Sequence, residues 1–407
     1  GTTAGLLAAL DWIIENRATY NIRVANLSLG VPAIDTWTND PLCRKVQELN
    51  LFGVLVVAAA GNNGRNALGQ KIYGQVHSPG NDPSVLTVGA SNSLGTDARN
   101  DDIMATYSSH GPTRSYYTDA TGQHFDNVIK PDIVAPGNKI VAAKARNNAL
   151  LYTMNPSLMT TAMDKAGEDN DVMYLSGTSM STPMVSGAAA LLFQMNPKLT
   201  PTMVKMILEY SAQPLNGVNM LEQGAGQLNI DGAIKIGPTY KFDTDFNDYA
   251  QGTSLLQSGQ AFPVATSTIA GTTFPWAQGI LTNATYLKGQ SLADKYHQAY
   301  ANYFWFEDGV SYDASNNPSL NSWFGTGITM FKNVLTSNGT AMGGGTVMMA
   351  SGVLVGDGVL VGDGVLVGDG VLVGDGVLVG DGVLVGDVTT SLANKVEITG
   401  DNTAAMK

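Results

Sequence analysis

The spacing of hydrophobic and polar residues over roughly the first 240 positions predicts alternating helices and strands. Leucine, isoleucine and tryptophan recur at helical spacing between Thr3 and Asn16, which indicates an amphipathic helix. The apolar run between Gly53 and Gly64 is continuous instead, as in a strand covered on both faces. Further strands are predicted at 24–30, 84–90 and 138–143. Further helices are predicted at 41–50, in a segment that ends at about residue 195, and in the segment after Thr200, which would be its N-cap. This order predicts an open, mostly parallel α/β sheet.

The composition of the sequence changes at about Pro238, after which aromatic residues, threonine and glycine are frequent and hydrophobic residues no longer recur at helical spacing. We expect a mostly β region up to residue 351, with one helix at 291–304. Six identical copies of GVLVGD follow at 352–387, each a short apolar strand and a Gly-Asp-Gly turn. They would form a β-solenoid or a narrow meander, or they arose by slippage of the coding DNA with little selection on structure. The chain thus divides into 1–237, 238–351, 352–387 and a tail at 388–407.

Composition narrows the function classes. The chain of 407 residues is long enough for two or three domains, and its formal net charge of −12 argues against non-specific nucleic-acid binding. Cys43 is the single cysteine, so a disulfide framework or a zinc cluster within one chain is excluded. No apolar run reaches the roughly 18–20 residues that span a bilayer. The chain opens without a methionine or a signal peptide, so we expect it to be part of a longer reading frame.

The stretch SGTSMSTPMVSGAAALL, at 176–192, carries candidate chemistry. Ser179 would lie in the first turn of a helix, where backbone N–H groups are free and the helix dipole is positive. A serine nucleophile needs a base for its proton and donors for the developing oxyanion, and a helix start supplies donors. Taken alone, the stretch is more typical of a buried helix of small residues with serines as N-caps.

Five further blocks accompany this stretch: VANLSLG, VVAAAGNNG, SPGNDPSVLTVGA, YSSHGPT and KPDIVAPG. Together, and in this order, the six blocks resemble the subtilases, the subtilisin-like serine peptidases. The resemblance covers residues 1–237. It implies a subtilisin-like, mostly parallel sheet with helices on both faces, truncated at its N-terminal end. It also implies a serine endopeptidase with protein or peptide substrates, which needs no cofactor for its chemistry.

The resemblance also assigns roles to individual residues. Ser179 matches the nucleophile, and Asn62 matches the asparagine whose amide donates to the oxyanion. The strand edge that pairs with the substrate backbone matches Ser28, Leu29 and Gly30. One wall of the pocket for the residue before the scissile bond matches Ala59, Ala60 and Gly61, with residues 77–80 near its floor.

The family's catalytic aspartate and histidine precede the helix on which this chain begins. His77, His110, His124 and His297 all follow it, and none carries the family's histidine motif. We therefore expect no triad-dependent proteolysis from this chain alone. The family's missing strand would also leave apolar edges exposed, which predicts marginal stability or aggregation.

Two alternatives stay open: a non-catalytic pseudoprotease that binds peptides, and a surface or structural repeat protein built on GVLVGD. Asp132, with carbonyls near Gly80 and Asp82, matches a weak cation site in some subtilases, so a structural calcium is one interpretation. One carboxylate is a sparse shell for calcium, and an aspartate capping a loop is the other interpretation. The resemblance and the low charge content imply a secreted or cell-surface protein, and the sequence indicates no oligomeric state.

Overall fold

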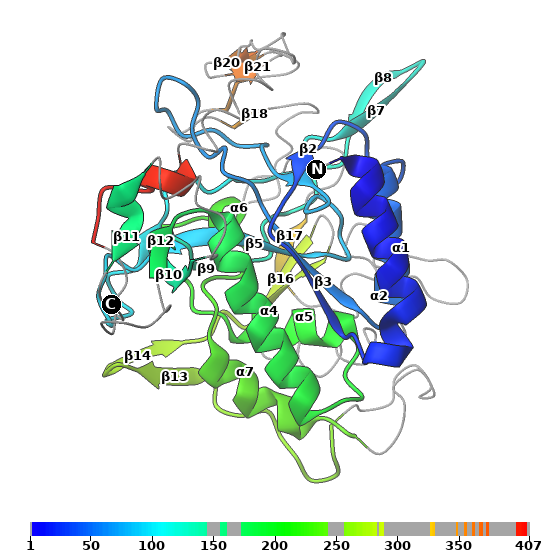
Figure 1. The fold of residues 1–407 in the computed structure, drawn as a ribbon, viewed down its shortest axis with the longest axis vertical. Helices are drawn as coiled ribbons and strands as arrows, with labels where there is room; N and C mark the ends of the chain where they lie inside the picture. Colours follow the sequence, from blue (N-terminus) through cyan, green and yellow to red (C-terminus); the bar gives the residue numbers. More distant parts are fainter. Residues whose placement is uncertain are drawn as a thin grey trace.

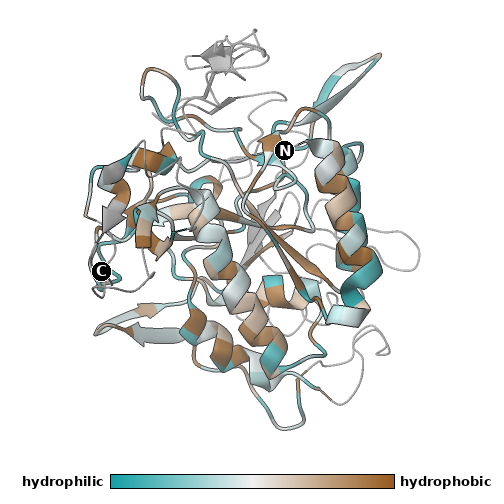
Figure 2. Ribbon diagram, in the orientation of Figure 1, coloured by the Kyte–Doolittle hydropathy of each residue, from teal (hydrophilic) through white to brown (hydrophobic). Residues whose placement is uncertain are grey.

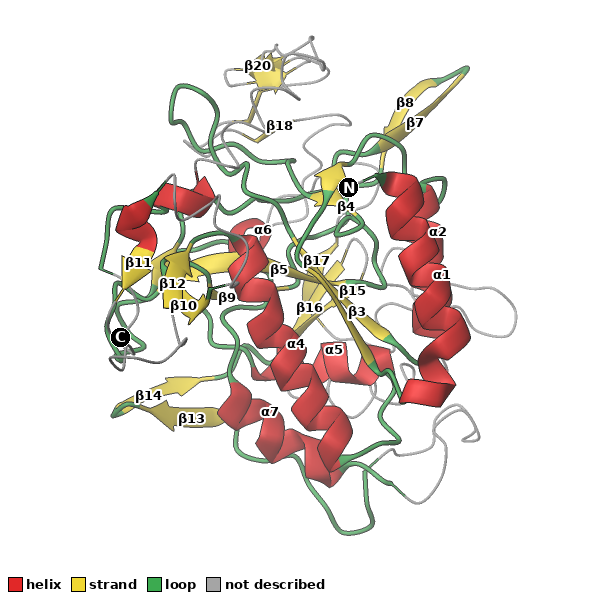
Figure 3. Cartoon of the chain, in the orientation of Figure 1, coloured by secondary structure: helices red, strands yellow, loops and turns green. Residues whose placement is uncertain are grey.

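The computed structural model describes residues 2–144, 155–160, 172–242, 256–282 and 396–404, and the backbone of seven short strands between 285 and 373. The helices are α1 (Thr3–Tyr20), α2 (Pro41–Leu51), α4 (Thr178–Met195), α5 (Pro201–Ser211), α6 (Met220–Gln223) and α7 (Ile230–Ile236). The strands of the main sheet are β1 (Val24–Leu27), β3 (Leu55–Ala59), β5 (Leu86–Asn92), β6 (Ile103–Met104) and β9 (Ile133–Pro136). Figures 1 and 3 show this sheet at the centre of the molecule, with helices on either side.

The main sheet is parallel apart from one short strand, as its sequence pattern predicts. β1 pairs with β3, β3 with β5, and β5 with β9, all in parallel register. β6 is antiparallel and pairs only with the end of β5. The carboxyl ends of β1 and β3 therefore lie next to each other, and ligand sites of open α/β sheets gather at such ends.

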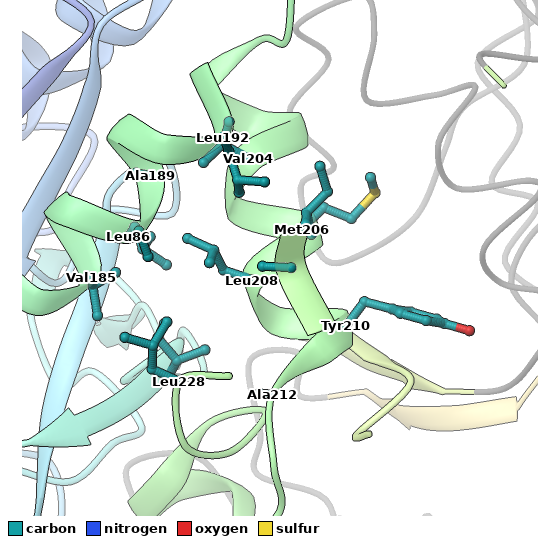
Figure 4. Close-up of a cluster of buried hydrophobic side chains, with 14 of the residues drawn as sticks. Leu86, Val185, Ala189, Leu192, Val204, Met206, Leu208, Tyr210, Ala212 and Leu228 are labelled. Carbon is teal, nitrogen blue, oxygen red and sulfur yellow. The ribbon is translucent and has the colours of Figure 1, made fainter. Parts of the chain in front are cut away.

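β3 is buried along its whole length because both faces of the sheet are covered. Its residues Leu55 and Val57 pack into a cluster with α4 and α5, part of which Figure 4 shows. Val56 and Ala58 point the other way and pack with α1 and α2. β3 accordingly has the colour of hydrophobic residues in Figure 2. The prediction of a strand covered on both faces is confirmed.

Local signals set the helix boundaries. Thr200 caps α5, since its hydroxyl accepts from the N–H of Met203 at 3.1 Å, and Pro201 occupies the first helical position. α1 is longer than the sequence pattern suggested. It ends at Tyr20 because the next residue, Asn21, has a left-handed φ of 51°. α4 has Gly177 at its N-cap and therefore no capping side chain.

Smaller sheets surround this core. They comprise β2 (Val31–Pro32) with β4 (His77–Ser78), β7 (Tyr116–Asp119) with β8 (Gly122–Phe125), and β11 (Met159–Thr160) and β10 (Ile140–Ala143) on either side of β12 (Val172–Leu175). Beyond residue 238, β13 (Thr266–Ile269) pairs with β14 (Thr272–Pro275), and β16 (Thr285–Lys288) pairs with β15 (Gly279–Thr282) and β17 (Thr326–Thr329). Trp276 and Ile280 pack into the same cluster as α4 and α5.

Much of the second half of the chain lies outside the described residues, including the predicted helix at 291–304. β18 (Val347–Met348) pairs with β19 (Leu354–Val355). Within the repeats, β21 (Leu366–Gly368) pairs antiparallel with β20 (Leu360–Gly362) and β22 (Leu372–Val373). The β-rich character of 238–351 and the order of the GVLVGD repeats therefore stay predictions.

One strand edge and several apolar side chains are exposed in the described part of the chain. Among the described strands, β1 pairs only with β3, which leaves its outer edge unpaired. Trp12 and Tyr20 of α1 stack on each other and are 51% and 64% exposed. Such surface favours association in water, so the expectation of marginal stability or aggregation stands as a prediction.

The core cluster predicts a large contrast between two leucines. Leu208 of α5 is fully buried, whereas Leu68 is 83% exposed. We expect Leu208→Ala to lower the free energy of unfolding by about 2–5 kcal/mol, because it removes buried methyl groups and leaves a cavity. Leu68→Ala, the matched control, should change it by less than about 0.5 kcal/mol. Urea unfolding followed by circular dichroism measures both, and equal losses would contradict the assignment of the core.

Candidate active site

The first turn of α4 lies against the turns that follow β1 and β3. Gly177 precedes this helix with a φ of 142°, a conformation that side chains rarely adopt. The first N–H groups of a helix have no acceptor within the helix, and the N-cap residue Gly177 has no side chain that could accept from them. The helix start therefore offers backbone donors and the positive end of its dipole to whatever faces it.

Ser179 and Ser28 form a reciprocal pair across this junction. The Ser179 hydroxyl donates to the carbonyl oxygen of Ser28 at 3.1 Å. The Ser28 hydroxyl donates to the carbonyl oxygen of Ser179 at 2.8 Å. Both residues are half-buried, so the sequence-predicted nucleophile is held next to the sequence-predicted substrate edge.

Asn62 is fixed in orientation by Thr178. Its Oδ1 accepts from the Thr178 N–H at 2.9 Å and from the Thr178 hydroxyl at 3.1 Å. The same hydroxyl accepts from the N–H of Gly61 at 3.2 Å. Because Oδ1 is occupied in this way, the Nδ2 donor is directed elsewhere, and a Cβ added to Gly177 would lie 3.1 Å from it. The amide of Asn62 is thus oriented beside the start of α4.

The remaining predicted substrate residues differ in accessibility. Leu29 is 45% exposed, and Gly30 beside it is also exposed. Ala59 and Ala60 are 4% and 0% exposed, and Gly61 is buried as well. The accessible part of the predicted substrate site is therefore the edge that follows β1.

His77, near this edge, is committed to another contact. Its Nε2 lies 2.7 Å from Oδ1 of Asn63, an oxygen that can only accept, so Nε2 carries the proton. Burial lowers the pKa of His77 to about 4, which keeps the ring neutral at pH 7. A protonated Nε2 cannot take the proton of Ser179.

The other described histidines have structural contacts. Nδ1 of His110 lies 2.9 Å from the Ile72 carbonyl, and burial lowers the pKa of His110 to about 4. His124 pairs with Asp119 in the β7–β8 hairpin. No hydrogen bond links Ser179 to any of these three histidines in the described part of the chain. His297 lies outside the described residues.

Asp132 is buried in ion pairs, 1% exposed. Its Oδ2 lies 2.8 Å from the Lys130 ammonium, and its Oδ1 lies 2.9 Å from the Lys205 ammonium. Oδ2 also accepts from the N–H of Thr87 at 2.6 Å. Two ammonium groups already balance this carboxylate, so the contacts favour the structural interpretation over a calcium ligand. Within the described ranges, no group of three or more His, Cys, Asp or Glu residues is arranged to hold a metal ion.

Three residues of this region were missed by sequence reasoning. Thr178, which orients Asn62, was visible only as part of the GTS stretch. Lys130 stands beside Asp132 in KPDIVAPG, and this adjacency was an available signal for an ion pair. Lys205 offered no local signal, because its contact with Asp132 joins α5 to a distant strand.

Comparisons with known proteins point to the same family as the six sequence blocks that end with the stretch at 176–192. The family model described as "Subtilase family" matches residues 1–232. A serine protease named AprX from Bacillus subtilis (strain 168) is 32% identical over 239 residues, covering 58% of this chain and 48% of the relative. The human membrane-bound transcription factor site-1 protease is 32% identical over 242 residues, covering 59% and 18%.

Among solved structures, that of the prenylagaramide maturation protease PagA is 27% identical, with a TM-score of 0.40, and covers 57% of this chain and 67% of PagA. The chain spans about half the length of AprX and about a fifth of the site-1 protease. No helix in the described ranges is long and apolar enough to cross a membrane.

The buried histidines predict a pH dependence of stability. The folded chain binds the His110 proton only near pH 4, whereas the unfolded chain binds it at about 6.5. We therefore expect His110 to lower the free energy of unfolding as the pH falls from 6.5 to 4, by about 1.4 kcal/mol per pH unit.

The test compares urea unfolding of the wild type and His110→Gln across this range. The slope should be shallower in the variant by that amount, whatever its stability at pH 7. Burial raises the pKa of Asp82 to about 6, so Asp82 changes the free energy of unfolding with pH in the direction opposite to His110. This contribution is the same in the wild type and the variant, so the difference between their slopes isolates His110. Identical slopes would show that folded His110 binds its proton as the unfolded chain does.

Proposed function

The chain belongs to the subtilase family, and on that premise we propose that it supplies the nucleophile and oxyanion-binding groups of a serine endopeptidase. The observation that carries the proposal is the contact between Asn62 and the start of α4. Asn62 and Thr178 are 116 positions apart in sequence, and their hydrogen bond brings the Asn62 amide to the helix terminus that carries the Ser179 hydroxyl.

In the proposed reaction, Ser179 Oγ attacks the carbonyl carbon of a peptide bond. The oxygen of that carbonyl gains negative charge and accepts from Asn62 Nδ2 and from the Ser179 N–H. Thr178 holds the other end of the Asn62 amide before substrate arrives, so little reorganisation is needed as the charge develops. The positive end of the α4 dipole stabilises the same charge.

The proposed substrate is an extended protein or peptide segment beside Ser28–Gly30. Leu29 and Gly30 of this edge are exposed and follow closely after β1, so we propose that a peptide backbone pairs with it as an added strand. Its position beside Ser179 places a bound peptide within reach of the hydroxyl. We propose a secreted or cell-surface location, supported by similarity to a protein named as an extracellular serine proteinase.

Among the described residues, no base contacts the Ser179 hydroxyl. This hydroxyl donates to a backbone carbonyl, which cannot remove a proton to leave an alkoxide. The chain by itself is therefore proposed to lack triad-dependent proteolysis. The same observation favours the second candidate, a pseudoprotease that binds peptides at Ser28–Gly30 without cleaving them. The calcium interpretation of Asp132 receives no support from its two lysine partners.

A fluorophosphonate probe tests the state of the serine. We expect the purified chain to show no stoichiometric labelling within the time that an active subtilisin-like peptidase needs for complete labelling, because Ser179 is not activated. Intact mass spectrometry measures the adduct, with Ser179→Ala as the control. Rapid labelling that disappears in Ser179→Ala would overturn the proposed inactivity.

Asn62 is tested in a form that cleaves protein, such as the chain expressed with any sequence that precedes Gly1 in its gene. We expect Asn62→Ala to lower kcat by about 10²–10³ with little change in KM, because the oxyanion exists only after attack. Asn66→Ala, in the same loop but bonded to Gln70, should leave kcat within about twofold. An Asn62→Ala enzyme with normal kcat would remove this residue from the proposed reaction.

A further inference from the structure

The C-terminal segment, residues 396–404, lies on the core although about 160 residues separate it from α7, which ends at Ile236. Its first four residues form a helical turn, drawn in red in Figure 1 beside β11 and β12. Nothing in the sequence pattern predicted this placement. Its contacts reach the loop that leads into α4.

Hydrogen bonds join the C-terminal segment to that loop and to the side chain of Asn138, which lies between β9 and β10. The Ser176 N–H donates to the Glu397 carbonyl at 3.0 Å. The Asp401 N–H donates to Asn138 Oδ1 at 2.7 Å, and Asn138 Nδ2 donates to the Thr403 hydroxyl at 2.7 Å. Asn138 and Ser176 are 2% and 0% exposed, so these bonds are shielded from water.

A carboxylate anchors the segment at a second point. Asp401 Oδ2 accepts from the Thr106 N–H at 2.9 Å, and its Oδ1 accepts from the Thr106 hydroxyl. The Thr403 hydroxyl donates to Asn92 Oδ1 at 3.2 Å, and the Lys139 ammonium donates to the Thr403 carbonyl. Hydrogen bonds to a charged acceptor are the stronger kind, which makes Asp401 the main polar anchor.

The fit is also steric. Val396 packs on a small apolar cluster of Ala90, Ala105 and Tyr107. Gly400 has a φ of 56°, and a Cβ added there would lie 2.2 Å from Ser176 Oγ and 2.4 Å from Asn138 Oδ1. Glycine is the residue that this surface accommodates at position 400.

The docking surface connects directly to the candidate active site. Ser176 Oγ accepts from the Lys139 N–H at 2.9 Å, and the Gly177 N–H donates to the Gly137 carbonyl at 2.8 Å. Gly177 in turn packs beside the Asn62 amide. The contacts therefore run from the C-terminal segment through Ser176 and Gly177 to the start of α4.

We propose that residues 396–404 are an intramolecular docking segment that holds the loop preceding α4, and so positions Ser179 and Asn62. The occupant of this surface is the chain's own C-terminal segment, and the surface comprises Asn92, Thr106, Asn138, Lys139 and Ser176. The docking itself is independent of the proposed function. Only its consequence for catalysis rests on that proposal.

Hydrogen exchange of the full chain, followed by mass spectrometry, tests the docking. Gly400→Ala should raise exchange at the Ser176 and Thr106 amides by about tenfold or more, because both donate to the segment. Gly259→Ala is the matched control: it also has a left-handed φ, 78°, but an added Cβ meets nothing within 4 Å. It should leave both amides unchanged. Asp401→Ala, which removes an acceptor without adding bulk, should raise exchange at Thr106.

Rescue in trans distinguishes docking from a general loss of stability. A synthetic peptide of residues 396–404 should restore protection at Ser176 in Gly400→Ala, and the same peptide with Asp401→Ala should not. Unchanged exchange in both variants would overturn the proposal. So would wild-type protection that disappears on dilution, since that would assign the bound segment to a second copy of the chain. None of these readouts needs proteolytic activity, so they stand apart from the test of Ser179.

Discussion

The close approach of the turn after β3 to the first turn of α4 is the constraint on which the site depends. Gly61 and Gly177 both have positive φ values, 109° and 142°, and both lie where a Cβ would press on neighbouring atoms. With glycine at these positions, the Asn62 amide and the Thr178 hydroxyl bond directly to each other. A helix start placed elsewhere would leave the serine, the amide and the edge after β1 unrelated to one another.

Burial on both faces of the sheet keeps that approach rigid. Alternate residues of β3 pack into two separate clusters, so the strand cannot shift by one residue without placing its side chains in the wrong cluster. Behind the strands, Asp132 ties β9 to β5 through Thr87 and to α5 through Lys205. Burial of a charged group is unfavourable unless partners compensate it, and here two lysines do so. Such a cluster is sensitive to the loss of one partner and fixes the positions of the elements that carry it.

Sequence reasoning succeeded where the signal was local. The cap at Thr200, the fully buried β3 and the parallel order of the strands all follow from spacing and composition. It failed where the contact joins distant segments. Lys205 and Asp132 meet only because α5 packs on the face of the sheet formed by Leu55 and Val57 of β3, and the Ser28–Ser179 pair exists only once β1 and α4 are assembled. The docking of Asp401 on Thr106 is more remote still, because the two residues are 295 positions apart in sequence.

The two chemical requirements of a serine peptidase are separable in this fold. The groups proposed to bind the oxyanion are a helix start, a strand-end amide and the loop beneath them, and all of these are held by contacts within the described residues. Proton removal needs a base at the Ser179 hydroxyl, a position that the Ser28 carbonyl occupies here. The oxyanion part is therefore organised by packing that does not require the base. A base brought to Ser179 by another segment would have to displace the half-buried hydrogen bond to the Ser28 carbonyl, because the groups proposed to stabilise the developing charge are already in place.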